Sequence, residues 1–465
     1  MKRLAFLLLA LGCSIAPDAL PPTGQIVLYF DTDAPVPPGD GKSLTRDDPA
    51  PLFDTLRVEV FEPGQSEPCG ACTREFPIDA HKFATRSVSI GIPTKPGVSG
   101  YRVRASIFPQ EWVFPCALIP DADKRGNAAC ASDPAARIPH PATVIARTIG
   151  LPPVGKEGVN ELTMMLDTES VGVPQGSLDA PTEPTPGRPG VSQVGTWPGA
   201  TRNGCVSAPR DDEACVPSGA FWRGNARPAE WLHIPISPRL VVLAPFFMKK
   251  AEVTVRECRG VSGCASYASS NANVLGKYWC DYTPTPTSND ELPVNCLIVA
   301  PMKAYCESSG RELPSAAQLE YAGRGLVGSM YVWGNDDPTC EDAMWGRGSE
   351  TDALTKGPCY ALPRGPYRAG SGKRDRLVLP TGTIVDLAGN LQEWAQDATP
   401  PDCNCPWPAG VLRDPVCNDP GGTHYAATGG SWTYGSSALA LGLPGCGQAN
   451  FIASMNGFRC SRPGL

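Results

Sequence analysis

A Pro-rich stretch near the middle of the sequence divides the chain into two parts. Residues 171–202 are rich in Pro, Gly, Thr and Ser, with Pro-Thr-Glu-Pro-Thr-Pro at positions 181–186. Such a stretch is too polar and too rich in proline to form its own core, so we interpret it as a semi-extended linker. A chain of 465 residues has room for two or three domains. We therefore expect one domain over residues 20–168 and another over residues 203–465.

The first thirteen residues resemble a bacterial lipoprotein signal peptide. Lys2 and Arg3 give a positive start, eight apolar residues follow over positions 4–11, and Gly12-Cys13 is the cleavage site. Eight apolar residues are too few to span a bilayer as a helix. We expect a lipid on Cys13 that anchors the protein in the cell envelope, and Ser14 favours the outer membrane. The alternative is an ordinary secretory signal in which Cys13 stays unmodified.

The cysteine count agrees with export. Of 19 cysteines, 18 remain after Cys13 is set aside, four before the Pro-rich stretch and fourteen after it. Even numbers on both sides predict disulfides formed in an oxidising compartment. Cys69-Gly-Ala-Cys72 also matches redox and zinc motifs, but no helix pattern follows it and no second ligand pair accompanies it. We interpret Cys69 and Cys72, together with Cys116 and Cys130, as members of structural disulfides.

Charge and histidine content exclude several function classes. The formal net charge of −7 gives no electrostatic footprint for nucleic acid or for an anionic membrane surface. The four histidines, at positions 81, 140, 233 and 424, are scattered and show no metal-binding spacing. The sequence contains no Gly-rich phosphate loop, no nucleophile elbow and no Ser-His-Asp pattern.

The region 20–168 has the pattern of an all-β domain. Runs of β-branched and aromatic residues, or alternating apolar and charged residues, are separated by turn residues. These runs lie at 25–30, 56–60, 87–92, 101–105, 142–149 and 161–166. A β-sandwich is the simplest assembly of such strands. We interpret Asp31 and Asp33, at the end of the first strand, as turn residues.

The region 203–465 has fewer regular elements. A strand is expected over 240–247. Helices are expected from Val255, over 301–308 and over 316–324, because Thr254 and Ser315 precede two of them with the spacing of a capping box. After Arg324 the sequence consists of short segments rich in Gly, Pro and Trp. A domain with so little regular structure depends on disulfides, bound ions and loop packing.

One stretch, Asp386-Leu-Ala-Gly-Asn-Leu-Gln-Glu-Trp394, combines unusual demands. Two carboxylates bracket a Gly-Asn pair that tolerates positive φ. Carboxylates and carbonyl oxygens on a curved loop are the ligands that calcium prefers. A β-turn with a solvated acid at each end is the alternative, and the spacing alone favours that turn.

The order of motifs in the C-terminal region resembles the formylglycine-generating enzyme (sulfatase-modifying factor) family over about residues 210–462. The motifs are Gly219-Ala-Phe-Trp-Arg-Gly224, Lys250-Ala-Glu-Val-Thr254, Pro293-Val-Asn295, Ala304-Tyr-Cys306, Arg311-Glu-Leu-Pro-Ser315, Leu319-Glu-Tyr-Ala322, Trp333-Gly-Asn335, Asp386 to Trp394, Gly429-Gly-Ser-Trp432 and Gly457-Phe-Arg-Cys460. The resemblance implies an α+β, C-type-lectin-like fold with little regular structure. The N-terminal β-domain lies outside it.

The resemblance also implies two structural features. The first is a structural calcium ion held by side chains at Asp386 and Glu393 and by carbonyls at Gly389 and Leu391. With the resemblance taken into account, we favour a calcium-binding loop over a simple β-turn at residues 386–394. The second is a disulfide between Cys306 and Cys460. A second calcium site of the family is expected to be missing, because Ala343-Met344-Trp345 lacks its side-chain ligand.

The catalytic positions of the family are altered in this sequence. Active members oxidise a substrate cysteine using Cu(I), a soft ion that suits two thiolates. The positions of those two cysteines hold Tyr434 and Leu439, so copper is not expected. The nearest cysteine, Cys446, lies beyond the second position and is expected to form a disulfide.

The leading hypothesis is a non-catalytic binding module for a peptide or a glycan, displayed by an exported lipoprotein. Ser431 and Trp432 are candidate residues of a groove, within a set of tryptophans that also includes Trp222, Trp333, Trp345 and Trp407. One alternative is a metal-dependent oxidoreductase acting on cysteines of exported proteins. Another is a structural envelope protein that binds its partner through the β-domain.

Overall fold

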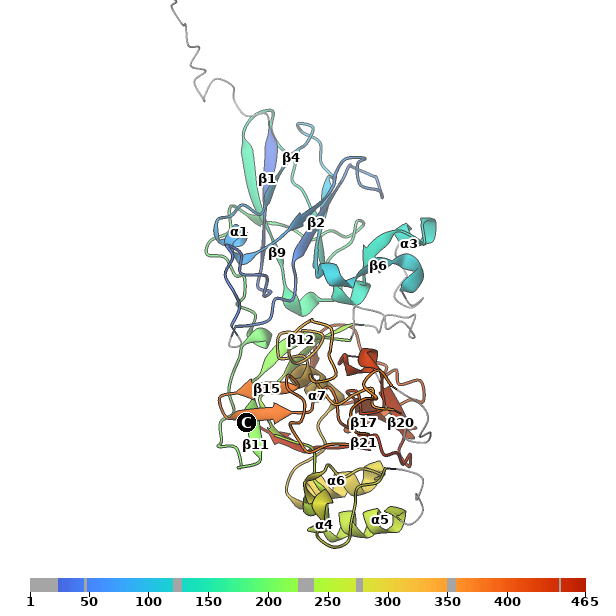
Figure 1. The fold of residues 1–465 in the computed structure, drawn as a ribbon. Coiled ribbons are helices and arrows are strands. Elements are labelled where there is room, and N and C mark those ends of the chain that lie inside the picture. Colours follow the sequence, from blue (N-terminus) through green and yellow to red (C-terminus); the bar gives the residue numbers. More distant parts are fainter. Residues whose placement is uncertain are drawn as a thin grey trace, which may run out of the picture.

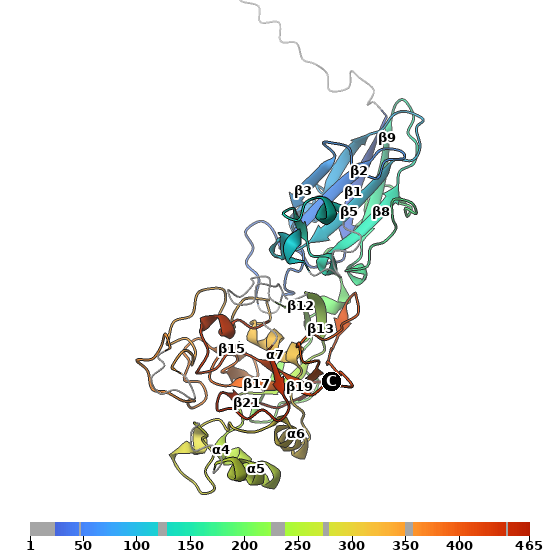
Figure 2. The same ribbon diagram turned by 90° about the vertical axis from the view of Figure 1, so that its right-hand side faces the viewer.

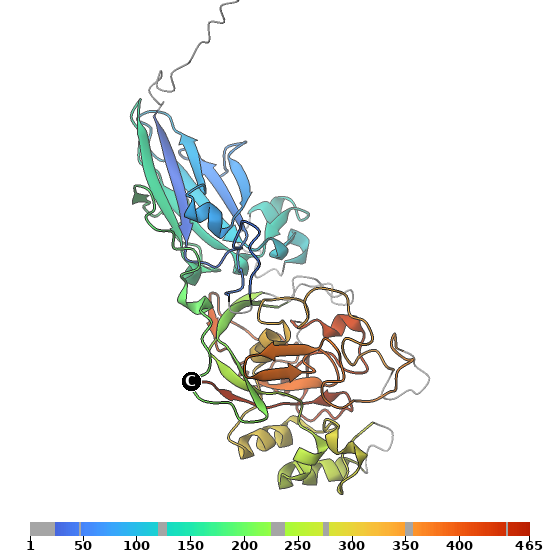
Figure 3. The ribbon, with the colours of Figure 1, turned by 60° about the vertical axis from the view of Figure 1, so that its left-hand side comes forward.

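The computed structural model describes residues 24–45, 48–119, 128–224, 238–272, 279–348, 357–442 and 445–465. Cys13 and His233 therefore lie outside the described residues. The two domains lie one above the other in all three views (Figures 1, 2 and 3), and the helices α4, α5 and α6 lie at the end of the C-terminal domain that is farthest from the N-terminal domain. Within the described ranges, no helix is long and apolar enough to cross a membrane.

The N-terminal domain contains two four-stranded sheets around one hydrophobic core. The first sheet has the order β10-β9-β1-β4 and the second β3-β2-β5-β8. Its strands are β1 (Gln25–Thr32), β2 (Thr55–Phe61), β3 (Thr73–Pro77), β4 (Ser89–Pro93), β5 (Arg102–Phe108), β8 (Ile145–Gly150), β9 (Val159–Leu166) and β10 (Thr185–Pro186). Buried side chains from both sheets, such as Leu28 and Val103, belong to the same cluster.

Each of the six runs predicted as strands in this region overlaps a strand. Four short strands had no such pattern: β3, β10, β6 (Val113–Pro115) and β7 (Arg137–Pro139). All five residues of β3 are exposed, so no alternation marks it. The helices here are α1 (Ala80–Ala84) and α3 (Ala128–Ser132).

The Pro-rich stretch packs along the N-terminal domain. Its short strand β10 pairs with β9, and Trp197 is 1% exposed. The two aspartates predicted as turn residues hold this region in place. Asp31 accepts hydrogen bonds from the backbone of Gln193 and the hydroxyl of Ser192, and Asp33 accepts from Thr168. The Pro-rich stretch has no core of its own, and its Trp197 packs into the core of the N-terminal domain.

The two domains share a packed boundary. Trp222 lies in the same hydrophobic cluster as the N-terminal sheets, and its indole N–H donates to the carbonyl of Leu52 at 2.7 Å. The ring of Phe53 meets it edge to face at 5.5 Å. Arg413 also forms an ion pair with Glu169. These contacts fix the domains against each other.

The C-terminal domain is made of small sheets with short strands. Their orders are β11-β14-β22, β12-β13-β18, β15-β16 and β20-β19-β17-β21. The strands are β11 (Glu213–Val216), β12 (Gly219–Arg223), β13 (Arg239–Leu243), β14 (Phe246–Lys249), β15 (Arg376–Leu379), β16 (Gly382–Val385), β17 (Gln392–Thr399), β18 (Leu412–Arg413), β19 (His424–Thr428), β20 (Gly445–Gln448), β21 (Asn456–Gly457) and β22 (Ser461–Pro463). The strand expected over 240–247 is divided between β13 and β14, which belong to different sheets. The fold is thus mixed and rich in sheet, with few helices.

The described part of the C-terminal domain also contains four α-helices: α4 (Val255–Arg259), α5 (Ser262–Ala272), α6 (Val299–Ser308) and α7 (Ala316–Gly323). The capping boxes at Thr254 and Ser315 are both formed. The N-termini of α4 and α7 were therefore predicted correctly from the sequence. The helix α5 was not predicted, because its small and polar residues carry little helical periodicity.

Candidate functional site

The loop Asp386–Trp394 connects β16 to β17 and has an unusual backbone. Positive φ occurs at Asp386 (56°) and Asn390 (70°). Glycine is required at position 389 because there is no space for a side chain: a Cβ there would lie 2.8 Å from the carbonyl oxygen of Met344. The amide of Asn390 donates to the same carbonyl at 2.9 Å. The loop is therefore pressed against the segment 343–345.

Asp375 holds the turn of this loop from inside. Its carboxylate accepts hydrogen bonds of 2.9–3.0 Å from the backbone N–H groups of Leu387, Ala388 and Gly389. Burial raises the pKa of Asp375 to about 6, although these hydrogen bonds oppose the rise. Asp375 could not be recognised from the sequence, because the loop that it holds begins eleven positions later and no local motif connects the two.

Glu252 supports the loop from the opposite direction. One carboxylate oxygen accepts from the Leu391 amide at 3.0 Å and the other from the Asn390 side chain at 2.6 Å. Burial, and then the charges of Asp386 and Glu393, raise the pKa of Glu252 well above its ordinary value. Glu252 belongs to the motif at 250–254, but only the fold brings it to this loop.

Arg459 neutralises Glu393. Its Nε and Nη2 donate to the Glu393 carboxylate at 2.6–2.8 Å, and both side chains are almost fully buried. Nη2 also donates to the carbonyls of Val385 and Asp386. Burial raises the pKa of Glu393, and the Arg459 charge opposes that rise. The Arg459 guanidinium, from the segment that precedes β22, thus contacts both ends of the loop.

Asp386 is left with an unpaired oxygen. Its Oδ2 accepts from the Gly370 amide at 2.6 Å, whereas its Oδ1 is buried and has no hydrogen-bond partner. Burial, and then the neighbouring Asp375, raise the pKa of Asp386 to about 7. A buried carboxylate oxygen without a partner is costly, and a cation is one way to satisfy it.

The predicted calcium ligands are compatible with a hard cation at this loop. Asp386 offers the unpaired Oδ1, and Glu393 Oε2 accepts only the Arg459 Nε–H, so one of its lone pairs remains. In the described part of the chain, no three His, Cys, Asp or Glu side chains are placed to hold a metal together, so a cation here would need the loop carbonyls as well.

The resemblance places the family's two copper-binding cysteines at Tyr434 and Leu439, and both residues contact the segment 345–346. Leu439 is 0% exposed and packs with Trp345, Ala388 and Tyr331. Tyr434 is half-buried, and its carbonyl accepts from the Gly346 amide at 2.8 Å. Neither side chain is a ligand for Cu(I), which requires soft donors.

The candidate groove residues lie below the surface. Ser431 and Trp432 are both 0% exposed, and the Ser431 hydroxyl is 2.8 Å from that of Thr433. Neither side chain reaches a ligand from that position. An exposed aromatic residue contacts this pair: Trp279 is 44% exposed and meets Trp432 edge to face at 6.2 Å.

All eighteen described cysteines form nine disulfides, and every pair stays on one side of the Pro-rich stretch. The pairs are Cys69–Cys72, Cys116–Cys130, Cys205–Cys215, Cys258–Cys264, Cys280–Cys296, Cys306–Cys460, Cys340–Cys359, Cys403–Cys446 and Cys405–Cys417. The predicted bridge between Cys306 and Cys460 and the expected pairing of Cys446 are both present.

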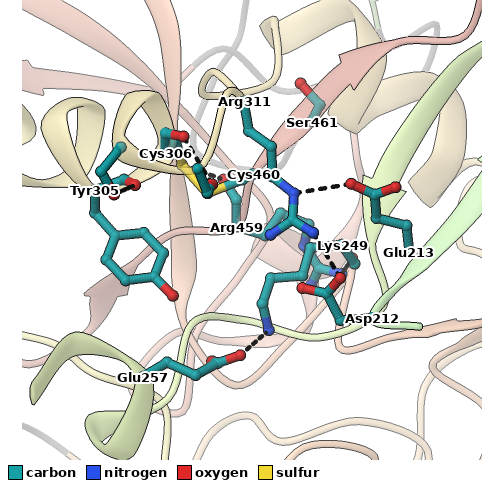
Figure 4. Close-up of a disulfide and its surroundings, with 12 residues drawn as sticks. Asp212, Glu213, Lys249, Glu257, Tyr305, Cys306, Arg311, Arg459, Cys460 and Ser461 are labelled. Atoms are coloured by element: carbon teal, nitrogen blue, oxygen red, sulfur yellow. Dashed lines mark hydrogen bonds and ion pairs between the residues drawn. A yellow bond between two sulfur atoms is a disulfide. The ribbon is translucent and has the colours of Figure 1, made fainter. Parts of the chain in front are cut away.

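The Cys306–Cys460 disulfide lies in a network of ion pairs (Figure 4). Arg311 donates to Glu213 at 2.8 Å and to Asp212 at 2.6 Å. Burial raises the pKa of Glu213, but hydrogen bonds from Arg462, then from the Arg210 amide, and then from Arg311 lower this pKa to about 2. Glu213 of β11 therefore contacts Arg311, which follows α6, and Arg462 of β22.

The remaining sequence candidates are separate from one another. His81 pairs with Asp40, His140 accepts from Ala142, and His424 contacts Thr423. Of the other tryptophans, Trp222 and Trp345 are buried, and Trp333 and Trp407 are partly buried.

Comparison with known proteins agrees with the motif order. Residues 202–463 match the family described as "Sulfatase-modifying factor enzyme 1-like domain". The formylglycine-generating enzyme of Streptomyces coelicolor is 30% identical over 152 residues, covering 30% of this chain and 43% of that protein, so the chain spans less than half of this relative.

Two solved structures are also similar. PvdO from Pseudomonas aeruginosa has 17% identity and a TM-score of 0.36, with 54% of this chain and 94% of that chain covered. Treponema denticola variable protein 1 has 16% identity and a TM-score of 0.35, with 54% and 98% covered. Through residues 202–463, which exceed half of its length, the chain belongs to the sulfatase-modifying factor enzyme 1-like domain family.

Proposed function

We propose that this protein is an exported, non-catalytic binding module whose family domain carries a ligand-binding face in place of the copper centre. The observation that carries the proposal is the burial of Leu439 in an apolar cluster, since the resemblance puts Tyr434 and Leu439 at the positions of the copper-binding cysteines. The disulfide pairing of all described cysteines supports it, because no thiolate remains among them for Cu(I).

The proposed fold has two parts. The C-terminal domain takes the C-type-lectin-like arrangement of its family, and the two N-terminal sheets pack as a β-sandwich. The shared core of those sheets supports the second part. In this arrangement the N-terminal domain holds the C-terminal domain through Trp222 and leaves the face around Tyr434 and Trp279 open to a partner.

Calcium is proposed as a structural ion at the loop Asp386–Trp394. The carboxylates of Asp386 and Glu393 and the carbonyls of Gly389 and Leu391 would hold it. Its contribution would be positive charge and hard coordination that fix the loop. The unpaired Asp386 Oδ1 supports this proposal.

A lipid on Cys13 that anchors the protein in the outer membrane completes the proposal. The many disulfides support an oxidising, extracytoplasmic setting. Membrane fractionation of the wild-type protein and of C13A tests the anchor. We expect the wild-type protein in the membrane fraction and C13A in the soluble fraction, and equal distributions would contradict the anchor.

The experiment for the binding module is a thiol titration combined with copper analysis. The protein from Ser14 onward is purified without reductant and denatured before titration. We expect no free thiol and no copper. The double variant Y434C/L439C serves as the control, because it places two thiols at the family positions and shows that the assay detects them.

Two reactive thiols with near-stoichiometric copper in the wild-type protein would instead support the metal-dependent oxidoreductase. A third option, a structural envelope protein, is separated by ligand binding. Binding confined to the N-terminal domain, unaffected by variants around Trp279, would favour it over the binding module.

A further inference from the structure

The N-terminal domain contains a cavity of about 300 Å³ between the edge strands of its two sheets. The strands β3 and β4 are the outermost strands of their sheets, and residues of both line the cavity. Its floor is formed by four side chains of the hydrophobic core that are at most 8% exposed: Phe30, Leu56, Ile78 and Val88. Cavities of this size with mainly apolar walls are typical binding sites for small molecules.

An uncovered aromatic ring shows that the core is open at this edge. Phe76 of β3 lies directly opposite Leu56 of β2, so both side chains are on the same face of the sheet. Leu56 is 1% exposed, whereas Phe76 is 37% exposed. Ile90 of β4 is half-buried and packs against the same core. Phe76 and Ile90 both line the cavity, so its mouth as well as its floor offers apolar surface.

The polar groups of the cavity come from α1 and the segment that follows it. Lys82, Ser87 and Ser89 all line the cavity. The backbone amide and the hydroxyl of Ser87 both donate to the Lys82 carbonyl, at 2.9 Å and 3.1 Å. The Lys82 ammonium donates to the carbonyl of Pro77, a further lining residue, at 2.8 Å and pairs with Asp79 at 3.2 Å. An ammonium group has three N–H donors, so one remains for a ligand.

Lys82 gives the cavity a positive charge at its mouth. It is the one charged residue among the described residues that line the cavity, and its side chain is 41% exposed. Its acidic partner, Asp79, is the N-cap of α1 and does not belong to the lining. An apolar cavity with a single cation at its mouth is complementary to an apolar molecule that carries one negative charge.

The two edge strands are poor templates for a further β-strand. Each has five residues, and they end at Pro77 and Pro93. Proline cannot donate a backbone hydrogen bond to a neighbouring strand, and Arg74 and Glu75 place charges on β3. A small molecule therefore suits this place better than an extended peptide that pairs with the sheet edge.

We propose that this cavity binds a small apolar carboxylic acid, such as a medium-chain fatty acid. Its hydrocarbon chain would lie against Phe76, Ile90 and the floor, and its carboxylate would accept a hydrogen bond from the Lys82 ammonium. Burial of the chain supplies the affinity, and the charge-assisted hydrogen bond selects an anion. This site goes beyond the proposed function, because it belongs to the other domain and its small ligand differs from the peptide, glycan or envelope partner considered above.

Isothermal titration calorimetry on the full chain tests this inference. The probes are decanoate, decanol and decylamine, which share a hydrocarbon chain and differ in the head group. Decanoate is used below the concentration at which it forms micelles. We expect decanoate to bind, and the other two probes to bind about tenfold more weakly or less, because they offer no anion to Lys82. Equal binding of decanol, or no binding of decanoate, would overturn the inference.

The variant K82Q removes the charge at the mouth. It should lower the affinity for decanoate about tenfold and leave the affinity for decanol unchanged. Because Lys82 also contacts Pro77 and Asp79, decanol reports whether the cavity itself has changed. The matched control is K95Q, since Lys95 is an exposed lysine of the same domain outside the cavity lining. Equal losses of decanoate affinity in K82Q and K95Q would show non-specific charge attraction and overturn the inference.

The variant I90W fills the cavity from its wall. It should abolish decanoate binding, and thermal unfolding shows whether it keeps the fold. A folded I90W that still binds decanoate would overturn the inference, and if I90W does not fold, the K82Q and probe comparisons decide. Displacement of decanoate by a blocked peptide of alternating Val and Thr would assign the cavity to an extended peptide and also overturn it. The thiol and copper analysis of the C-terminal domain is independent of all these results.

Discussion

The N-terminal domain is built from long strands around an apolar core, whereas the C-terminal domain is built from short strands around buried charges. The strands β1 and β9 have eight residues each and pair in parallel over their whole length. In the C-terminal domain, strands of two to five residues are the rule and only β17 is longer among the described strands. Seven of the nine disulfides lie there as well.

Buried charge shows the same contrast. In the described ranges, the N-terminal domain buries one carboxylate, Asp31, and the C-terminal domain buries twelve charged residues. These are Glu213, Lys249, Glu252, Glu320, Arg324, Asp342, Arg347, Asp375, Asp386, Glu393, Asp397 and Arg459. A domain with little regular structure leaves many loop amides to satisfy, and buried carboxylates such as Asp375 satisfy them. The first domain is thus specified by hydrophobic pattern and the second by cross-links and ion pairs.

The largest expected difference between the domains comes from their disulfides. Cys306–Cys460 joins residues 154 positions apart, and Cys116–Cys130 joins residues 14 positions apart. Loop-closure entropy predicts a loss of about 5 kcal/mol for C306A/C460A and about 3 kcal/mol for C116A/C130A. Urea unfolding followed by fluorescence measures both. A smaller loss for the long loop would contradict the idea that the C-terminal domain depends more on its cross-links.

The second prediction compares two arginine–glutamate pairs of similar geometry. Arg459–Glu393 is buried, whereas Arg104–Glu59 on the N-terminal sheet has side chains 39% and 15% exposed. R459L leaves Glu393 buried without a partner and should cost about 3–5 kcal/mol. R104L should cost less than about 1 kcal/mol. Equal losses in urea unfolding would show that burial does not separate the two pairs.

The third prediction concerns calcium, which is proposed only for the C-terminal domain. At a free calcium concentration 100 times the dissociation constant, the folded state gains about 2.7 kcal/mol. Calcium should therefore raise the unfolding midpoint of the wild-type protein, and chelation should lower it. D386N should lose most of this response. The N-terminal variant D33N is the control and should keep it.

The fourth prediction is a pH dependence from Asp281, a partly buried residue of the C-terminal domain. Burial raises the pKa of Asp281 to about 8, and its Oδ2 has no hydrogen-bond partner. The folded state therefore holds a proton that the unfolded state releases near pH 4, so stability falls as pH rises from about 4 to about 8.

The variant D281N isolates this effect, because its amide cannot ionise. Its stability relative to the wild-type protein should increase by about 1–3 kcal/mol between pH 5 and pH 7. Thermal unfolding across this range measures the difference. Parallel curves for the two proteins would show that Asp281 is ionised in the folded state and would contradict the prediction.

The contrast between the domains explains what the sequence could predict. Alternation in runs such as 56–60 and 101–105 identified β2 and β5, because one face of each strand is buried. Capping boxes located α4 and α7 because they are local signals. The motif order, rather than any periodicity, identified the C-terminal domain and its Cys306–Cys460 bridge.

The site was predicted only in part, because its contacts are non-local. Asp375, Glu252 and Arg459 reach the loop from three distant segments, and no local spacing connects them. The burial of Ser431 and Trp432 was also hidden, since a Gly-Gly-Ser-Trp motif does not show which side chain is covered. The exposure of Trp279 was missed for the same reason.

The smallest expected effect concerns helix caps, where the two domains should behave alike. Ser315 caps α7 and Asp79 caps α1, each through a hydrogen bond to a backbone amide three residues later. S315A and D79A should each cost about 1 kcal/mol, because one amide loses its partner. Differential scanning calorimetry of both variants measures this. Since a cap acts locally, similar losses would locate the difference between the domains in their cores and cross-links. A much larger loss for S315A would mean that α7, packed against β12 and β17, depends on its cap for the position of the whole C-terminal sheet.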